Sequence, residues 1–216
     1  MTATLVTRVA RYRENGGMTL EELLDVKQRT TPPEPPPPGV RLNLGSGIDK
    51  KEGWIDVDAN PEFAPDVCAD AVAHVASLDD SSVDEIYAGH FVEHLDRDVA
   101  ERFLAACRRV LKPQGRIGVV VPDTGAIMRR YVEEGLDLDD LCHLFLYSTV
   151  QETHHKWSYD LTTLRRLLER AGFVVGGEID RFDDPRLHAG AWWQCGLDGV
   201  KPRPSPLRRV FHRRPR

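Results

Sequence analysis

The chain has 216 residues with a formal net charge of −5, and 41% of its residues are hydrophobic. This length allows one domain of ordinary size with extensions, and the hydrophobic content is enough for a buried core. The acidic balance is unfavourable for a nucleic-acid-binding domain, because such domains carry an excess of positive charge. We therefore expect no specific nucleic acid among its partners.

The C-terminal residues 201–216 differ from the rest, because they contain seven Lys and Arg residues and no Asp or Glu. We interpret this basic tail as a solubilising end of the chain. The alternative is a weak contact with an anionic membrane surface, where each Lys or Arg contributes about 1 kcal/mol.

The cysteines and the N-terminus indicate the compartment. The four cysteines are widely separated: Cys68, Cys107, Cys142 and Cys195. They form no CxxC metal or redox pair, so a reducing environment is expected. No apolar run approaches the roughly 20 residues of a membrane span, and Arg8 and Arg11 interrupt any signal-peptide pattern. The sequence predicts a soluble cytoplasmic protein.

The first part of the chain is predicted to be an N-terminal extension, residues 1–31, with one helix. Thr19 and Glu22 fit a capping box, and the pattern predicts a helix over residues 20–29. Residues 32–39 contain six prolines. Such a segment is expected to form a stiff linker of polyproline II conformation rather than helix or inner strand.

Residues 40–200 are predicted to form the main domain, in which strands alternate with helices. Strands are expected over residues 40–44, 54–58, 66–70, 83–88, 116–121, 173–179 and 191–196. Helices are expected over residues 98–111, 124–134, 138–147 and 161–171. This alternation predicts an α/β doubly wound, mainly parallel Rossmann-like sheet, whose ligands bind beyond the carboxyl ends of the strands.

Three features follow the first three strands. Gly45-Ser46-Gly47 can turn sharply and point amides at a carboxylate or phosphate. Asp58 can accept hydrogen bonds from ribose hydroxyls, and Asp70 from an adenine amine. Each feature alone also fits an ordinary turn or a solvated loop acid. Together, in chain order and each at a strand end, they predict a site for an adenosyl compound.

Two common nucleotide motifs are excluded. Lys50 stands where the dinucleotide fingerprint needs a third glycine, and Asp58 follows Gly45 by only 13 residues, whereas that fingerprint expects about 20. The sequence also contains no GxxxxGK[ST] loop. NAD binding and nucleoside triphosphate hydrolysis are therefore disfavoured.

Five segments carry a resemblance to a known family: residues 42–47 (LNLGSG), 54–61 (WIDVDANP), 69–70 (AD), 82–95 (SVDEIYAGHFVEHL) and 109–117 (RVLKPQGRI). They resemble class I S-adenosylmethionine-dependent methyltransferases, most closely the small methyltransferases of the type 11 group.

The resemblance implies a seven-stranded sheet in which the strand over residues 191–196 is antiparallel. It also implies a site for the cofactor S-adenosylmethionine. In that site Gly45, Ser46 and Gly47 adjoin the methionine moiety, Asp58 binds the ribose and Asp70 the adenine. Gly89 and His90 lie near the sulfonium.

This sequence departs from the family pattern at two places. Gln114 replaces a glycine in the turn of residues 112–115, and only ten residues separate Gly47 from Asp58. The second departure leaves no room for a full crossover helix, so the first helix of the fold should be vestigial or absent. We hypothesise that the helix over residues 20–29 covers the sheet face exposed by this loss.

Two histidines are candidate catalytic bases. His90 follows an apolar strand, and His155 lies near Trp157 and Tyr159 after the fifth strand, where related methyltransferases carry a substrate-binding insertion. Either histidine can also be a plain loop or cofactor-contact residue. Positioning is the larger catalytic effect, about 7–11 kcal/mol against ~3–5 kcal/mol for a general base.

The sequence therefore predicts methyl transfer from S-adenosylmethionine to a small molecule or glycan precursor, with oxygen as the expected acceptor atom and no metal ligand. One alternative is a zinc hydrolase that uses the HxxEH motif of His90, Glu93 and His94. That motif requires both histidines in one helix, and here His90 ends a strand. The other alternative is a noncatalytic protein that retains the fold.

The proposed role of the N-terminal helix predicts the effect of a deletion. Removing residues 1–38 should lower the thermal unfolding temperature or the affinity for S-adenosylmethionine, because the apolar stripe of the helix would no longer cover the bared sheet face or the edge of the cofactor. Calorimetry on both forms measures both quantities. An unchanged melting curve together with unchanged binding would rule out this role.

Overall fold

The computed structural model describes residues 39–148, 153–178 and 192–203. The predicted N-terminal helix, most of the linker and most of the basic tail lie outside these residues. The strands are β1 (Arg41–Leu44), β2 (Ile55–Asp58), β3 (Val67–Cys68), β4 (Val83–Gly89), β5 (Leu111–Pro122), β6 (Tyr147–Ser148), β7 (Thr153–His154), β8 (Val174–Glu178) and β9 (Gln194–Val200). The helices are α3 (Ala71–Ser77), α4 (Arg97–Val110), α5 (Thr124–Glu134), α6 (Leu138–Leu146) and α7 (Leu161–Arg170), with the 3-10 turns η1 (Pro61–Phe63) and η2 (Val92–His94).

Seven of the strands form one sheet in the order β3-β2-β1-β4-β5-β9-β8. Strands β3, β2, β1, β4 and β5 are parallel, and β9 runs antiparallel to both β5 and β8. This confirms the predicted doubly wound, mainly parallel sheet with one antiparallel strand. That strand begins at Gln194 and runs to Val200, four residues beyond the predicted end, because it pairs with β5 as far as Arg116.

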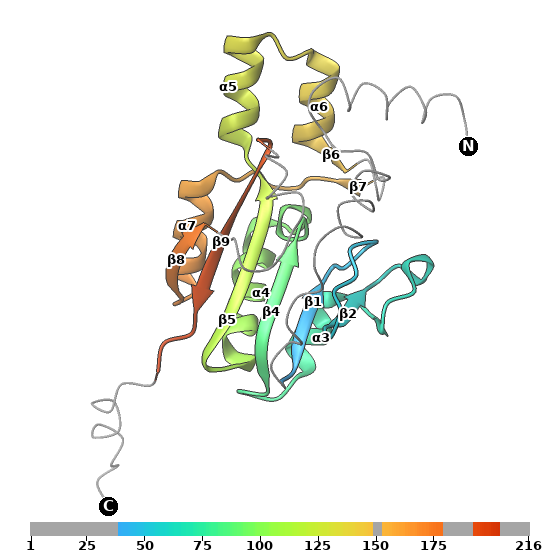
Figure 1. The fold of residues 1–216 in the computed structure, drawn as a ribbon, viewed down its shortest axis with the longest axis vertical. Helices are drawn as coiled ribbons and strands as arrows, with labels where there is room; N and C mark the ends of the chain where they lie inside the picture. Colours follow the sequence, from blue (N-terminus) through green and yellow to red (C-terminus); the bar gives the residue numbers. More distant parts are fainter. Residues whose placement is uncertain (1–38, 149–152, 179–191, 204–216) are drawn as a thin grey trace, which may run out of the picture.

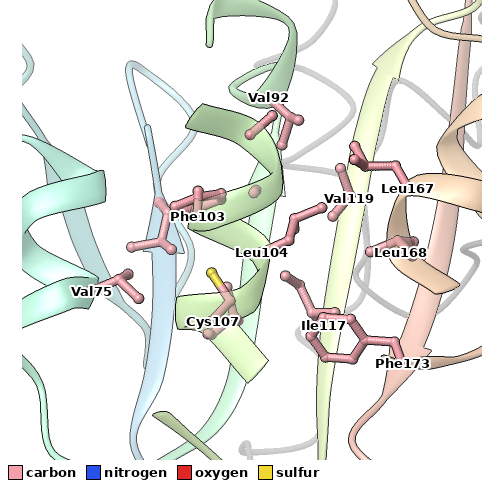
Figure 2. Close-up of a cluster of buried hydrophobic side chains, with 14 of the residues drawn as sticks. Val75, Val92, Phe103, Leu104, Cys107, Ile117, Val119, Leu167, Leu168 and Phe173 are labelled. Carbon is pink, nitrogen blue, oxygen red and sulfur yellow. The ribbon is translucent and has the colours of Figure 1, made fainter. Parts of the chain in front are cut away.

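One face of the sheet carries the hydrophobic core. Leu42 and Leu44 of β1 point to this face, and the intervening Asn43 points to the other, as the alternation of a strand requires. Helices α3, α4 and α7 pack on the apolar face (Figure 1). Figure 2 shows α4 in the middle of this layer, with Phe103 and Leu104 fully buried. The predicted apolar stripe of residues 98–111 thus forms the centre of the core.

The connection between β1 and β2 contains no helix in the described part of the chain, which confirms the prediction from its short length. Polar side chains on the sheet hold this loop instead. Asn43 donates to the Asp49 carbonyl and to the Asp56 carboxylate, both at 2.7 Å, and Arg41 donates to the Gly53 carbonyl at 2.9 Å. Buried polar groups and loop carbonyls therefore satisfy one another where a helix would otherwise pack.

Two features were not predicted as the structure has them. Helix α3 follows β3 immediately and is too short to show a clear sequence period. The predicted break over residues 112–115 lies inside β5, because Leu111 already pairs with Val83 and the register shifts before Glu85 pairs with Arg116.

The glycine replacement in this turn has a conformational consequence. Gln114 has a φ of 71°, in the left-handed region that glycine adopts without cost. Its amide donates to the Lys201 carbonyl at 2.9 Å, which holds the turn against the end of β9. The turn therefore keeps its shape at the expense of local strain.

We predict that Gln114→Gly stabilises the protein by about 1 kcal/mol, because it removes a left-handed cost of roughly 1–2 kcal/mol and adds the smaller entropy cost of glycine. For a chain of this size, the thermal midpoint should rise by about 2–4 °C. The matched control is Gly135→Ala, which places a Cβ at φ 75° with no other heavy atom within 4 Å. Gly135→Ala should lower the thermal midpoint by a similar amount. A lower midpoint for Gln114→Gly than for the wild type would show that Gln114 is not strained.

Candidate functional site

The turn after β1 requires glycine for two reasons. Gly45 and Gly47 have φ values of 66° and 48°, and a Cβ on Gly45 would lie 2.4 Å from the Phe91 ring. The amides of Gly45 and Ser46 both donate to the Val57 carbonyl, at 2.9 and 3.2 Å. The turn is therefore fixed to β2 on one side and packed against the residue after His90 on the other.

Asp58 connects this turn to the end of β2. Its Oδ2 accepts from the Gly47 amide and its Oδ1 from the Asn60 amide, both at 2.8 Å, and only 6% of the residue is exposed. Each carboxylate oxygen can accept a second hydrogen bond. The side chain of Ser46 is also buried, and its Oγ has no hydrogen-bond partner among the described residues.

Asp70 lies at the next strand end, two residues after β3. Its Oδ1 accepts from the Ala73 amide at 2.8 Å, so it caps the N-terminus of α3, and the residue is exposed. This cap fixes the carboxylate at the edge of the sheet and leaves its second oxygen facing solvent.

His90 directly follows β4 and has a strained conformation, with a φ of 52°. Its Nδ1 lies 3.2 Å from Oε1 of Glu93, and its Nε2 lies 2.7 Å from Oε1 of Gln194. The Trp193 ring lies 5.3 Å away between centroids. Both ring nitrogens thus have a side-chain partner, which holds the ring in place.

Glu93 is the most buried acid of the site, with 1% of the residue exposed. Burial opposes its ionisation, but the hydrogen bond from His90 and the charges of His90 and His94 outweigh this and hold the pKa of Glu93 below its ordinary value. Its Oε2 has no hydrogen-bond partner among the described residues. A buried, ionised oxygen is therefore left open within the site.

The segment that carries His155 is joined to Glu93 through the backbone. The amides of Lys156 and Trp157 donate to the Glu93 carbonyl at 2.8 and 3.1 Å. Figure 1 shows β7 and helices α5 and α6 beyond the carboxyl ends of β4 and β5. The chain thus returns over the strand ends and places His155 beside the residues that follow β4.

His94 and His155 meet at this junction, with their ring centroids 5.0 Å apart. The Nδ1 of His94 lies 3.2 Å from the His154 carbonyl, and the Nδ1 of His155 lies 3.1 Å from the Phe145 carbonyl. Burial lowers the pKa of His155, an effect that the negative charge of Glu93 opposes. His155 is therefore held as a neutral imidazole whose lone pair is on Nε2.

The structure brings the predicted residues together in two groups. Gly45, Gly47 and Asp58 form the first at the ends of β1 and β2, with Asp70 at the edge beyond them. His90 connects this group, through Phe91, to the second group around Glu93. Sequence reasoning missed the central position of Glu93 and the contact of Gln194 with His90, which comes from a strand 104 residues away.

The HxxEH motif does not form a zinc-peptidase site. Only Val92–His94 is helical, as a 3-10 turn, and His90 precedes it with a left-handed backbone. His90 and His94 are therefore not on one helix face, which agrees with the expectation from the sequence.

Comparison with known proteins agrees with the fold. Residues 46–119 match the family model of a methyltransferase domain. No curated protein matches the chain significantly. Three solved structures, each 19% identical, share the fold. The first is an S-adenosylmethionine-dependent methyltransferase from Archaeoglobus fulgidus, with a TM-score of 0.50 over 91% of this chain and 94% of that one.

The second is a methyltransferase from Thermotoga maritima, described as a possible histamine N-methyltransferase, with a TM-score of 0.51 over 91% of this chain and 95% of that one. The third is the 1,6-didemethyltoxoflavin-N1-methyltransferase of Burkholderia thailandensis with bound 1,6-didemethyltoxoflavin and S-adenosylhomocysteine, with a TM-score of 0.50 over 76% and 72%. Residues 46–119 thus match a methyltransferase domain, and the fold is the one that these S-adenosylmethionine-dependent methyltransferases share. Among the described residues, no helix has the length and apolar composition of a membrane span.

Proposed function

We propose that the enzyme transfers the methyl group of S-adenosylmethionine to a hydroxyl oxygen of a small molecule or glycan precursor. The observation that carries this proposal is the neutral His155 beside the buried carboxylate of Glu93. A hydroxyl must lose its proton when it is methylated, so a base next to the acceptor is useful for oxygen acceptors in particular.

The cofactor end of the site is proposed to lie at the glycine turn. Gly45, Ser46 and Gly47 allow a close approach of the methionine moiety, Asp58 accepts from the ribose hydroxyls, and Asp70 accepts from the adenine amine. Gly89 and the fixed ring of His90 line the region of the sulfonium. The sulfonium supplies an activated methyl group, so the residues mainly have to hold the two reactants in line.

The acceptor end is proposed to lie at His155. Its Nδ1 is held by the Phe145 carbonyl, so Nε2 is the atom that takes the acceptor proton. His90 was the other candidate base in the sequence, with cofactor contact as its alternative role, and both of its nitrogens have partners. We therefore assign His90 to cofactor contact and positioning, and the base to His155.

A nitrogen acceptor is the second candidate. The Burkholderia structure is described as an N1-methyltransferase of 1,6-didemethyltoxoflavin, and the Thermotoga structure as a possible histamine N-methyltransferase. An amine with a free lone pair can attack the methyl group before it loses a proton. N-methylation therefore has less need of a base at His155 than O-methylation has.

The features that favoured a noncatalytic protein do not affect this site. Gln114 lies at the start of β5, at the opposite end of the strand from Pro122. The shortened crossover is fixed by Asn43 and Arg41, so the loss of the helix leaves the glycine turn in a defined position.

We predict that Asp58→Ala weakens binding of S-adenosylhomocysteine at least tenfold, because each hydrogen bond to a charged group contributes about 1.5–3 kcal/mol. Titration calorimetry measures this affinity. The matched control is Asp98→Ala, which removes the same charge from the exposed surface of α4 and should leave binding unchanged. Equal affinities in the two variants would exclude Asp58 from the cofactor site.

We predict that His155→Ala lowers kcat at least tenfold and leaves the affinity for S-adenosylhomocysteine unchanged, since a general base contributes roughly 10²–10⁴-fold. The assay measures transfer of a labelled methyl group to a panel of hydroxylated small molecules and sugar nucleotides. His74→Ala on α3 controls for the loss of a partly buried histidine. Full turnover in the His155 variant rejects the base.

A further inference from the structure

We propose that Glu93, His94 and His155 form a binding site for a divalent transition metal of the zinc class. The carboxylate of Glu93 and one ring nitrogen of each histidine all lie within 4.8 Å of one another. Two of these residues follow β4, and the third comes from the segment after β7. The fold therefore assembles three metal-ligating groups of the right chemistry at one point.

The strongest support is the open oxygen of Glu93. Its carboxylate is buried, and Oε1 contacts His90 while Oε2 has no hydrogen-bond partner among the described residues. A buried carboxylate oxygen without a partner carries a desolvation cost unless a cation or donor compensates it. A metal ion on Oε2 would provide that compensation.

The two histidines are oriented as metal ligands usually are. In each, Nδ1 lies within hydrogen-bonding distance of a backbone carbonyl, of His154 in one case and of Phe145 in the other. Such a bond fixes the tautomer and directs the lone pair of Nε2 towards the metal. His90 has a comparable supporting role, because it orients Glu93 through Oε1.

The set of ligands selects the kind of metal. Two imidazoles and one carboxylate are typical of zinc and neighbouring transition metals, whereas magnesium and calcium prefer oxygen ligands alone. His94 and His155 are only partly buried, so the metal would keep an open position towards solvent. Three protein ligands and one open position are typical of a catalytic rather than a structural zinc site.

The role of the metal deepens the proposed function and rests on it. The base role proposed for His155 belongs to the metal-free protein, because in the metal-bound protein the Nε2 lone pair of His155 is on the metal. The acceptor hydroxyl would instead occupy the open position, and the cation would lower its pKa so that the proton leaves to solvent before the methyl group is transferred. Binding of the metal itself does not depend on this role.

The test uses the full chain, stripped of metal with EDTA and dialysed. The stripped protein is titrated with Co²⁺, whose visible absorption reports nitrogen and oxygen coordination. The wild type should develop one band that saturates at one Co²⁺ per chain and is removed by Zn²⁺. Glu93→Gln and His155→Ala should each weaken binding at least tenfold, because even loss of a supporting partner costs 10–100-fold. His74→Ala should bind as the wild type does.

Circular dichroism shows whether each variant is folded. If Glu93→Gln unfolds, His155→Ala alone tests the metal site, since His155 is more exposed than Glu93. No stoichiometric band in the wild type, or equal affinity in His155→Ala and the wild type, overturns the metal site. Calorimetry with S-adenosylhomocysteine on the same stripped protein separates the two proposals. Cofactor binding without a cobalt band refutes the metal site and leaves the methyltransferase proposal intact.

Discussion

The interaction on which this structure depends is the double engagement of Glu93. Its carboxylate contacts His90, which directly follows the central strand β4, and its backbone carbonyl accepts from Lys156 and Trp157, which follow β7. One residue thus joins the end of β4 to the segment that returns over the strand ends. Because the carboxylate is buried and ionised, this junction is polar, directional and sensitive to its partners.

On the other side of the site, the loop between β1 and β2 is held by hydrogen bonds where a helix would be held by apolar packing. Class I folds place a helix between the first two strands, and this chain has only a short loop there. The loss of the helix costs little stability, because the sheet presents hydrogen-bonding groups there in place of apolar ones. These groups belong to Arg41, Asn43 and Asp56. The glycine turn, fixed by Asp58 at one end of this loop, therefore stays in place.

Most of the fold was predictable from the sequence, because strands and helices longer than one turn leave a periodic pattern. The core helix α4 and the central strand β5 are examples. A local departure was also predictable where one segment contains it, as with the missing first helix, whereas the positive φ of Gln114 is known only from the structure. The antiparallel direction of β9 was predicted from the family resemblance. The length of β9 is set by its pairing with β5, and no local sequence pattern indicates that pairing.

The site was only partly predictable for the same reason. Gly45 to Gly47 and Asp58 come together because each follows a parallel strand. The group around Glu93 combines residues from η2, the segment after β7 and the start of β9, and no spacing in the sequence relates them. The HxxEH motif drew attention to Glu93 and His94, but their partner proved to be His155, and His90 faces Gln194.

The way in which the returning segment is attached has a consequence for how such an enzyme can diverge. Its amides at positions 156 and 157 bond to a main-chain carbonyl, and these bonds do not depend on which side chains the two positions carry. Changes of side chain at these positions can therefore alter the surface of the segment while its main-chain bonds to Glu93 remain. The position of the segment and the chemistry of its surface are thus separately adjustable during evolution.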